Sequence, residues 1–198
     1  MIIDKIHSIL DLAGGSIFPE FPGVLRDVID TRVIVHVDKS YSTSVDYADL
    51  ANLLESRQLV DLYIKDDVWN FLQNFIRQFD MISCYRFLEH VPVDKVLTFI
   101  YLMRTKVKTG GYCDIIVPNW NDLRQIDIDT EDELMTKDYL TVVYELCNFP
   151  GDPHASVFTP KKLKKFFELE GGWEHVKTYE KYNFAGRDIY FRSVFKAI

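Results

Sequence analysis

The sequence has little of what marks several common protein classes. No apolar run among its 198 residues approaches the roughly 20 residues that a membrane-spanning helix requires. The N-terminal ten residues have no basic segment before an apolar core, so we expect no signal peptide. The three cysteines show no CxxC spacing and no histidine partners at matching spacing, so neither a disulfide framework nor a metal site is expected. These absences favour a cytoplasmic protein in a reducing compartment.

The sequence also lacks an excess of basic residues. Its net charge is −7, and an acidic protein gains little from counterion release on a phosphate backbone. Nucleic acid is therefore not the expected partner, and the basic run 161–165 is interpreted as the solvated side of a helix. Hydrophobic residues make up 47% of the chain, which is enough for one α/β domain with a sizeable core.

The stretch 79–120 predicts a strand, a helix and a second strand. An apolar strand over 79–83 is followed by a polar loop and by Pro92, which we expect to be the first residue of a helix. The apolar residues at helical spacing are Val93, Val96, Leu97, Ile100, Tyr101 and Val107. We expect Gly110-Gly111 to end this helix and 112–117 to form the next strand, after a right-handed crossover.

The N-terminal part predicts the first half of a nucleoside-binding fold. Two strands are expected, over 8–12 and 33–37. Gly14-Gly15 follows the first strand, where glycine lets the backbone approach a ligand closely. Asp38 ends the second strand, where a carboxylate can accept hydrogen bonds from both ribose hydroxyls. The loop lacks the later glycines of G-x-G-x-x-G, which disfavours a dinucleotide and hence a nicotinamide oxidoreductase.

A third strand over 59–64 leads to a second pair of acidic candidates. Asp66 and Asp67 follow this strand, and a carboxylate there can accept a hydrogen bond from an adenine amino group. The alternative role for Asp67 is the N-cap of the next helix. The apolar stripe of that helix is Phe71, Leu72, Phe75 and Ile76. A further helix is expected within 45–57.

The C-terminal third predicts two helices and a hairpin. A helix is expected over about 131–147, after an acidic stretch. A second helix begins with Thr159 as its N-cap and Pro160 as its first residue, and it ends at Gly171-Gly172. Two final strands, 173–182 and 188–195, are expected to pair as an antiparallel hairpin.

Several motifs, taken in order, carry a resemblance to a known family. They are Leu10-Asp11-Leu12-Ala13-Gly14-Gly15, Val37-Asp38, Asp67-Val68, Phe79-Asp80, Leu88-Glu89-His90-Val91, Lys108-Thr109-Gly110-Gly111, Val117-Pro118-Asn119 and His154 with Phe158-Thr159-Pro160. The set resembles the class I S-adenosylmethionine-dependent methyltransferases, in particular small bacterial-type members of uncertain substrate. The resemblance runs from about Ile9 to the end of the chain. It departs from the family at Ile17, where a further glycine is frequent.

The resemblance implies a fold, a domain plan and a cofactor. The implied fold is α/β and Rossmann-like, a doubly wound, mostly parallel seven-stranded sheet with an antiparallel C-terminal hairpin. One methyltransferase-like domain would cover 1–198, with a cofactor half over about 1–91 and an acceptor half over about 92–198 that includes a lid segment, 121–158. The implied cofactor is S-adenosylmethionine. The candidate contacts to it are Asp11, Ala13, Gly14, Gly15, Asp38, Lys39, Asp67, Val68, Cys84 and Tyr85.

Two histidines are candidates for catalysis if the acceptor is a hydroxyl, because histidine titrates near neutral pH. His90 follows the fourth strand, and the resemblance places His154 in a loop over the acceptor. The alternatives are a helix-start histidine and a loop-ordering hydrogen bond. His36 lies inside a strand and is expected to be structural. Cys84 is expected to be a packed cysteine rather than a nucleophile.

The acceptor class follows from what is missing after the fourth strand. Methyltransferases that modify nucleic-acid amines carry an Asn/Asp-Pro-Pro-aromatic run there, and this chain has none. We therefore expect a small-molecule, sugar or peptide acceptor. The alternative hypothesis is a non-enzymatic binding or assembly module that keeps the fold, suggested by Ala13, Ile17 and Phe18 in the first loop. The sequence indicates no particular oligomeric state.

Overall fold

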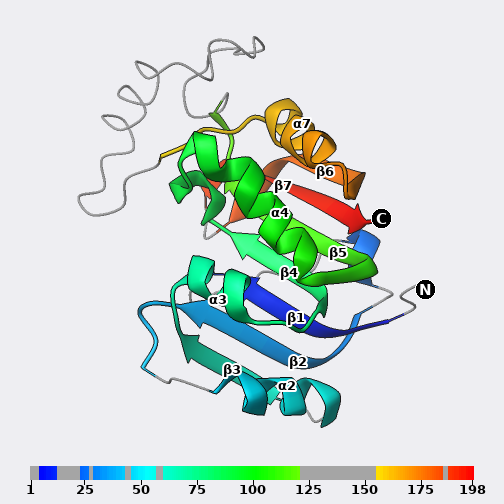
Figure 1. Ribbon diagram of the computed structural model, residues 1–198. Coiled ribbons are helices and arrows are strands. Elements are labelled where there is room, and N and C mark those ends of the chain that lie inside the picture. Colours follow the sequence, from blue (N-terminus) through cyan, green and yellow to red (C-terminus); the bar gives the residue numbers. More distant parts are fainter. Residues whose placement is uncertain are drawn as a thin grey trace.

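A seven-stranded mixed sheet forms the centre of the structure, a computed structural model that describes residues 5–12, 23–26, 29–42, 46–56, 60–120, 155–184 and 187–198 (Figure 1). The strands are β1 (Ile6–Leu12), β2 (Ile29–Asp38), β3 (Val60–Lys65), β4 (Phe79–Tyr85), β5 (Val107–Pro118), β6 (Trp173–Phe184) and β7 (Arg187–Ala197). The α-helices are α1 (Gly23–Arg26), α2 (Tyr47–Ser56), α3 (Val68–Asn74), α4 (Val96–Thr105) and α7 (Pro160–Glu170), and two 3₁₀ turns are η1 (Leu88–His90) and η2 (Val93–Lys95).

The strand order is β3-β2-β1-β4-β5-β7-β6. The first five strands pair in parallel, whereas β7 pairs antiparallel with both β5 and β6. In Figure 1 the arrow of β7 accordingly points opposite to those of β2 and β4. The predicted fold is confirmed: a mostly parallel, Rossmann-like seven-stranded sheet with an antiparallel C-terminal hairpin.

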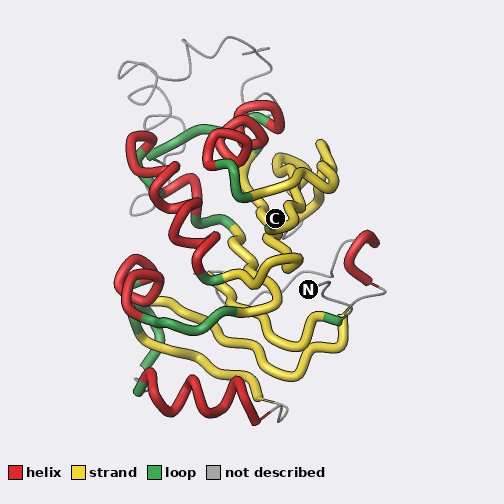
Figure 2. The backbone as a smooth tube through the Cα atoms, turned by 45° about the vertical axis from the view of Figure 1, so that its right-hand side comes forward, coloured by secondary structure: helices red, strands yellow, loops and turns green. Residues whose placement is uncertain are grey.

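The larger hydrophobic core lies between the sheet and helices α3, α4 and α7, which line one face (Figure 2). Alternate strand residues supply its sheet side, because successive side chains point to opposite faces. On β2 these are Val33, Val35 and Val37, all buried. The opposite face carries a small apolar cluster, in which Leu25 of α1 packs with Ile9 and Met81. That face also carries a second small cluster of Tyr85, Ile116 and Tyr190, together with several buried polar side chains.

The predicted boundary between α4 and β5 is wrong. The helix ends at Thr105 rather than at the glycine pair, and β5 already begins at Val107. Gly111 lies within β5, at a point where β4 passes too close to leave room for a side chain. A Cβ added at Gly111 would lie 2.5 Å from the carbonyl oxygen of Asp80. Gly110-Gly111 therefore permits a close strand contact and does not terminate a helix.

Several predicted buried positions around α3 and α4 are also wrong. Ile76 follows the short helix α3 and is 85% exposed. Leu97 and Tyr101 of α4 are exposed, while Phe99 and Met103 face the core in their place. Pro92 precedes η2 as its cap, so the helical turn begins one residue later than expected. Val96 and Ile100 are buried as predicted, so the apolar stripe differs from the prediction only along one side.

The predicted helix after Thr159 and the final antiparallel hairpin are confirmed. The Thr159 side chain accepts a hydrogen bond from the Lys162 backbone N–H, Pro160 opens α7, and Gly171 ends it with a left-handed φ of 87°. None of the described helices is long and apolar enough to cross a membrane. The predicted helix over 131–147 and most of the predicted lid, up to residue 154, lie outside the described residues.

Candidate functional site

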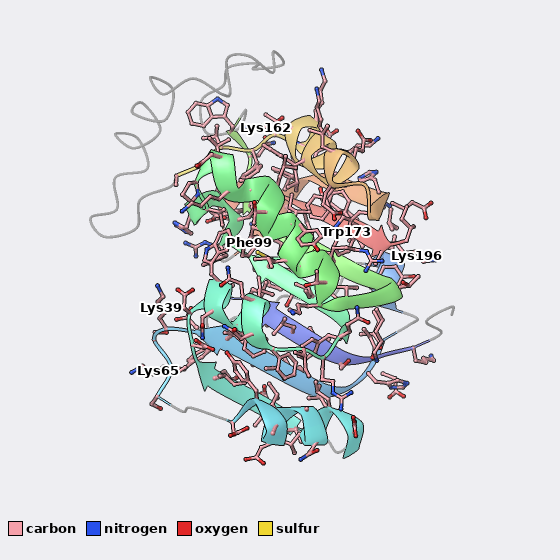
Figure 3. The ribbon with its side chains drawn as sticks, viewed as in Figure 1. Lys39, Lys65, Phe99, Lys162, Trp173 and Lys196 are labelled. Atoms are coloured by element: carbon pink, nitrogen blue, oxygen red, sulfur yellow. The ribbon has the colours of Figure 1, made fainter. Side chains whose placement is uncertain are left out.

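The carboxyl ends of five parallel strands meet at one edge of the sheet, here called the carboxyl edge. These ends are Leu12, Asp38, Lys65, Tyr85 and Pro118. β1 and β4 are neighbours at the centre, and the strand order runs outward from them in both directions. Ligands of open α/β sheets bind at such a switch point. Figure 3 shows Lys39 and Lys65 projecting at this edge.

Asp38 offers a partly exposed carboxylate at the carboxyl edge. Its Oδ1 accepts a hydrogen bond of 2.7 Å from the Ser40 backbone N–H. Its carbonyl oxygen accepts a further bond from the backbone N–H of Asp66, which joins the ends of β2 and β3. Among the described residues, none donates to its Oδ2. Within the described part of the chain, that oxygen can accept a hydrogen bond from a ligand hydroxyl.

Asp67 lies next to Asp38 and is engaged at both oxygens. Its Oδ1 caps α3 by accepting hydrogen bonds from the backbone N–H groups of Trp69 and Asn70. Its Oδ2 lies 2.6 Å from the Lys39 ammonium, which also projects from the end of β2. Burial alone would raise the pKa of Asp67, but Lys39 and the cap bonds outweigh it and hold this pKa below its ordinary value.

The N-cap role of Asp67 is thus confirmed, and it leaves the proposed adenine contact open. Val68, another candidate, is the buried first residue of α3. The alternative residue, Asp66, accepts hydrogen bonds from the Tyr47 hydroxyl and from the Asn70 side-chain amide. Its carboxylate therefore links α2 to α3.

Asp11 is buried in β1, on the polar face of the sheet. Its Oδ2 lies 2.7 Å from the Nδ1 of His36, and its Oδ1 accepts a 2.9 Å bond from the Ser83 hydroxyl. The other nitrogen of His36 lies 3.0 Å from a carboxylate oxygen of Asp61. Burial lowers the pKa of His36, but the two carboxylates outweigh this and raise it above its ordinary value. His36 is structural, as expected.

Cys84 and Tyr85 end β4 and are both fully buried. Burial raises the pKa of the Cys84 thiol well above its ordinary value, so the reactive thiolate is disfavoured. The Tyr85 hydroxyl donates a 2.7 Å bond to Asp114 on β5. Asp114 in turn accepts hydrogen bonds from Arg192 on β7, which also donates to Tyr182 on β6.

These contacts form a polar row that crosses all seven strands as two hydrogen-bonded groups, one ending at Ser83 and the other beginning at Tyr85, both on β4. In sheet order it consists of Asp61, His36, Asp11, Ser83, Tyr85, Asp114, Arg192 and Tyr182. Sequence reasoning missed Asp114 and Arg192. The available signal was a charged residue within each of two apolar strands, since a buried charge requires a partner of opposite sign.

A short segment ties down the loop that follows β4. The backbone N–H groups of Ala155 and Ser156 donate to the carbonyl oxygen of Glu89, at 2.7 and 2.9 Å. Further along, the Trp120 N–H donates to the Phe158 carbonyl oxygen. His90 directly follows Glu89 in η1 and is partly exposed. This part of the carboxyl edge is therefore fixed by residues far apart in the sequence.

Four candidate residues lie outside the described part of the chain: Ala13, Gly14, Gly15 and His154. The structure brings together Asp38, Lys39 and Asp67, and it places Leu12 of β1 beside Cys84 of β4. Within the described ranges, no group of three or more His, Cys, Asp or Glu residues is arranged to hold a metal ion.

Comparisons with known proteins support the fold. No protein-family model matches the sequence, and no curated protein sequence matches it. An S-adenosylmethionine-dependent methyltransferase from Clostridium acetobutylicum superposes with a TM-score of 0.56 at 15% identity, over 98% of this chain and 85% of that one. DhpI, solved in complex with SAH, gives 0.54 at 18% identity over 96% and 76%. This chain spans only 51% of an O-methyltransferase family protein from Burkholderia thailandensis, with a TM-score of 0.55 at 12% identity over 98% of this chain.

These similarities establish the architecture. The chain has the class I fold of the S-adenosylmethionine-dependent methyltransferases, as the sequence motifs implied. At 12–18% identity the comparisons show the fold alone.

Proposed function

We propose that this chain, which has the class I methyltransferase fold, transfers a methyl group from S-adenosylmethionine to a small molecule, a sugar or a peptide group. The observation that carries the proposal is the position of Asp38. It ends β2 at the carboxyl edge, beside the central β1–β4 pair. One of its carboxylate oxygens is bound to its own turn, and the other accepts from no described residue. A ribose presents two adjacent hydroxyl donors, which suit such a carboxylate.

The hydrogen-bond acceptors at the carboxyl edge fit the hydroxyl and amino donors of a nucleoside. Asp38 would hold the ribose, and Asp67 would face the adenine from the neighbouring strand end. The ion pair between Lys39 and Asp67 spans these two positions, so Lys39 must share or release Asp67 when an adenine amino group binds. Water screens exposed ion pairs of this kind, so this rearrangement costs little.

The chemistry on the acceptor side needs little from the protein beyond orientation. The bound cofactor supplies an electrophilic methyl group, and alignment of donor and acceptor can account for about 7–11 kcal/mol of the barrier. Acid–base help is needed only where the acceptor must lose a proton. His90 and His154 are our candidates for that step, and Cys84 is excluded by its burial and raised pKa.

Cofactor binding tests the proposal directly. We expect S-adenosylhomocysteine at a hundred times its dissociation constant to stabilise the protein by about 2.7 kcal/mol. For a domain of this length the unfolding midpoint should rise by roughly 5–10 °C. Asp38→Asn should weaken binding about tenfold or more, because it removes hydrogen bonds to a charged acceptor.

The matched control is Asp49→Asn, which removes an exposed carboxylate from α2 and should leave binding unchanged. An equal loss of affinity for S-adenosylhomocysteine in both variants would show that binding depends on the net charge of the protein and not on a contact between Asp38 and the ribose. No binding of either S-adenosylmethionine or S-adenosylhomocysteine to the wild-type protein would refute the proposal and support the alternative, a binding or assembly module with this fold.

A further inference from the structure

Arg86 has an unusual backbone at the point where β4 ends. It directly follows Tyr85, and its N–H donates a 2.8 Å bond to the Ile116 carbonyl oxygen of β5. Its φ is 56°, and it is the one non-glycine residue with positive φ in the described part of the chain. This left-handed conformation is unfavourable for a residue with a Cβ and concentrates at ligand sites, where the surroundings enforce it.

The surroundings of Arg86 are fixed on both sides. Before it, the Tyr85 hydroxyl donates to the Asp114 carboxylate within the buried polar row. After it, the carbonyl oxygen of Glu89 accepts two hydrogen bonds from the segment that begins at Ala155. The turn at Arg86 is therefore held in place, and its direction is set by the fold rather than by local preference.

The guanidinium of Arg86 is presented at the carboxyl edge. The residue is exposed, and its Cζ lies 5.9 Å from the centre of the Tyr190 ring. Tyr190 pairs with Pro118, the last residue of β5, so both groups lie where that strand ends. A guanidinium at this distance is attracted to the ring face by its charge, and its planar set of N–H donors can still point at a ligand.

The other described arginine side chains have protein partners. Arg77 pairs with Glu55, Arg104 donates to the carbonyl oxygens of Gly172 and Ile198, and Arg192 pairs with Asp114. Arg86 forms no ion pair or side-chain hydrogen bond with any described residue. Arg86 is thus an arginine in a strained turn with no carboxylate partner among the described residues, in a chain of net charge −7.

We propose that Arg86 binds an oxyanion on the methyl acceptor, a carboxylate or a phosphoryl group. The planar guanidinium matches both through two parallel hydrogen bonds. The inference rests on the proposed function in one respect, that the acceptor lies at the carboxyl edge. It narrows the acceptor to an anionic small molecule and assigns Arg86 the role of orienting it.

Paired probes test this inference. Benzoate is compared with benzamide, and phenyl phosphate with phenol, by ligand-observed NMR titration of the full chain with and without S-adenosylhomocysteine. We expect the wild-type protein to bind at least one anion more tightly than its neutral counterpart. Arg86→Gly should weaken that binding about ten- to hundredfold, because hydrogen bonds to a charged group are lost. Preference for benzoate or for phenyl phosphate identifies the oxyanion.

The variants separate this site from general charge and from folding. Glycine adopts the left-handed turn readily, so Arg86→Gly should unfold at no lower temperature than the wild type. Arg77→Gln, which removes an exposed arginine remote from the carboxyl edge, should leave anion binding unchanged. The inference is overturned if neither anion binds at millimolar concentration, if neutral probes bind equally, or if Arg86→Gly binds the anion as the wild type does.

The two proposals fail separately. Binding of S-adenosylhomocysteine is measured on the same samples and should be retained by Arg86→Gly. Loss of cofactor binding in the wild type refutes the methyltransferase but leaves the anion titration valid. Normal cofactor binding without an anion preference refutes only the role of Arg86.

Discussion

Replacing Arg192 tests whether the charges of the polar row hold the sheet together. The Arg192 and Asp114 side chains are 1% and 0% exposed. Removing one partner of a buried ion pair leaves the other charge uncompensated, at a cost of about 3–5 kcal/mol. Each kcal/mol lowers the midpoint of a domain this size by about 2–4 °C, so Arg192→Met should lower it by roughly 6–20 °C.

The assay is thermal and urea unfolding followed by circular dichroism, with Arg77→Gln as the control. The Arg77–Glu55 pair is 52% and 63% exposed, and surface pairs of this kind contribute about 1 kcal/mol at most. The double variant Asp114→Leu, Arg192→Met removes both charges and should recover part of the loss. The reasoning is wrong if Arg192→Met costs no more than Arg77→Gln, or if the double variant is less stable than the single one.

Two further predictions concern pH and packing. Because His36 has a raised pKa in the folded state, its contribution to stability is complete below its unfolded pKa of about 6.5 and is lost as pH rises through the folded pKa. Unfolding free energies measured from pH 6 to 9 should therefore fall in the wild type and fall less in His36→Gln; parallel curves would contradict the charged pairing with Asp11 and Asp61. Gly111→Ala should destabilise by about 1–3 kcal/mol, since its Cβ meets backbone atoms that cannot move freely. An unchanged urea midpoint would show that β4 and β5 can separate without cost.

Much of the candidate site was visible in the sequence because strand ends are marked locally. Val33 to Val37 is a β-branched run that ends in Asp38, so both the strand and the position of the carboxylate could be predicted. The alternative role given to Asp67, the N-cap of the next helix, is confirmed by the structure, while its contact to adenine stays a prediction. The pairing of Lys39 with Asp67 could not be predicted, because it depends on how β2 and β3 lie side by side.

The order of elements and the class of fold were determined by the sequence alone, through periodicity, caps and motif order. Tertiary structure decided the rest. It sets the start of β5 at Val107, packs Gly111 against β4, pairs Asp114 with Arg192, and brings Asp11 to Ser83 on the same face of the sheet. It also forced Arg86 into a left-handed turn. The reason is physical: periodicity reports which side of an element is apolar, whereas a buried charge or a strained turn depends on partners from other strands, which only the folded sheet brings within hydrogen-bonding distance.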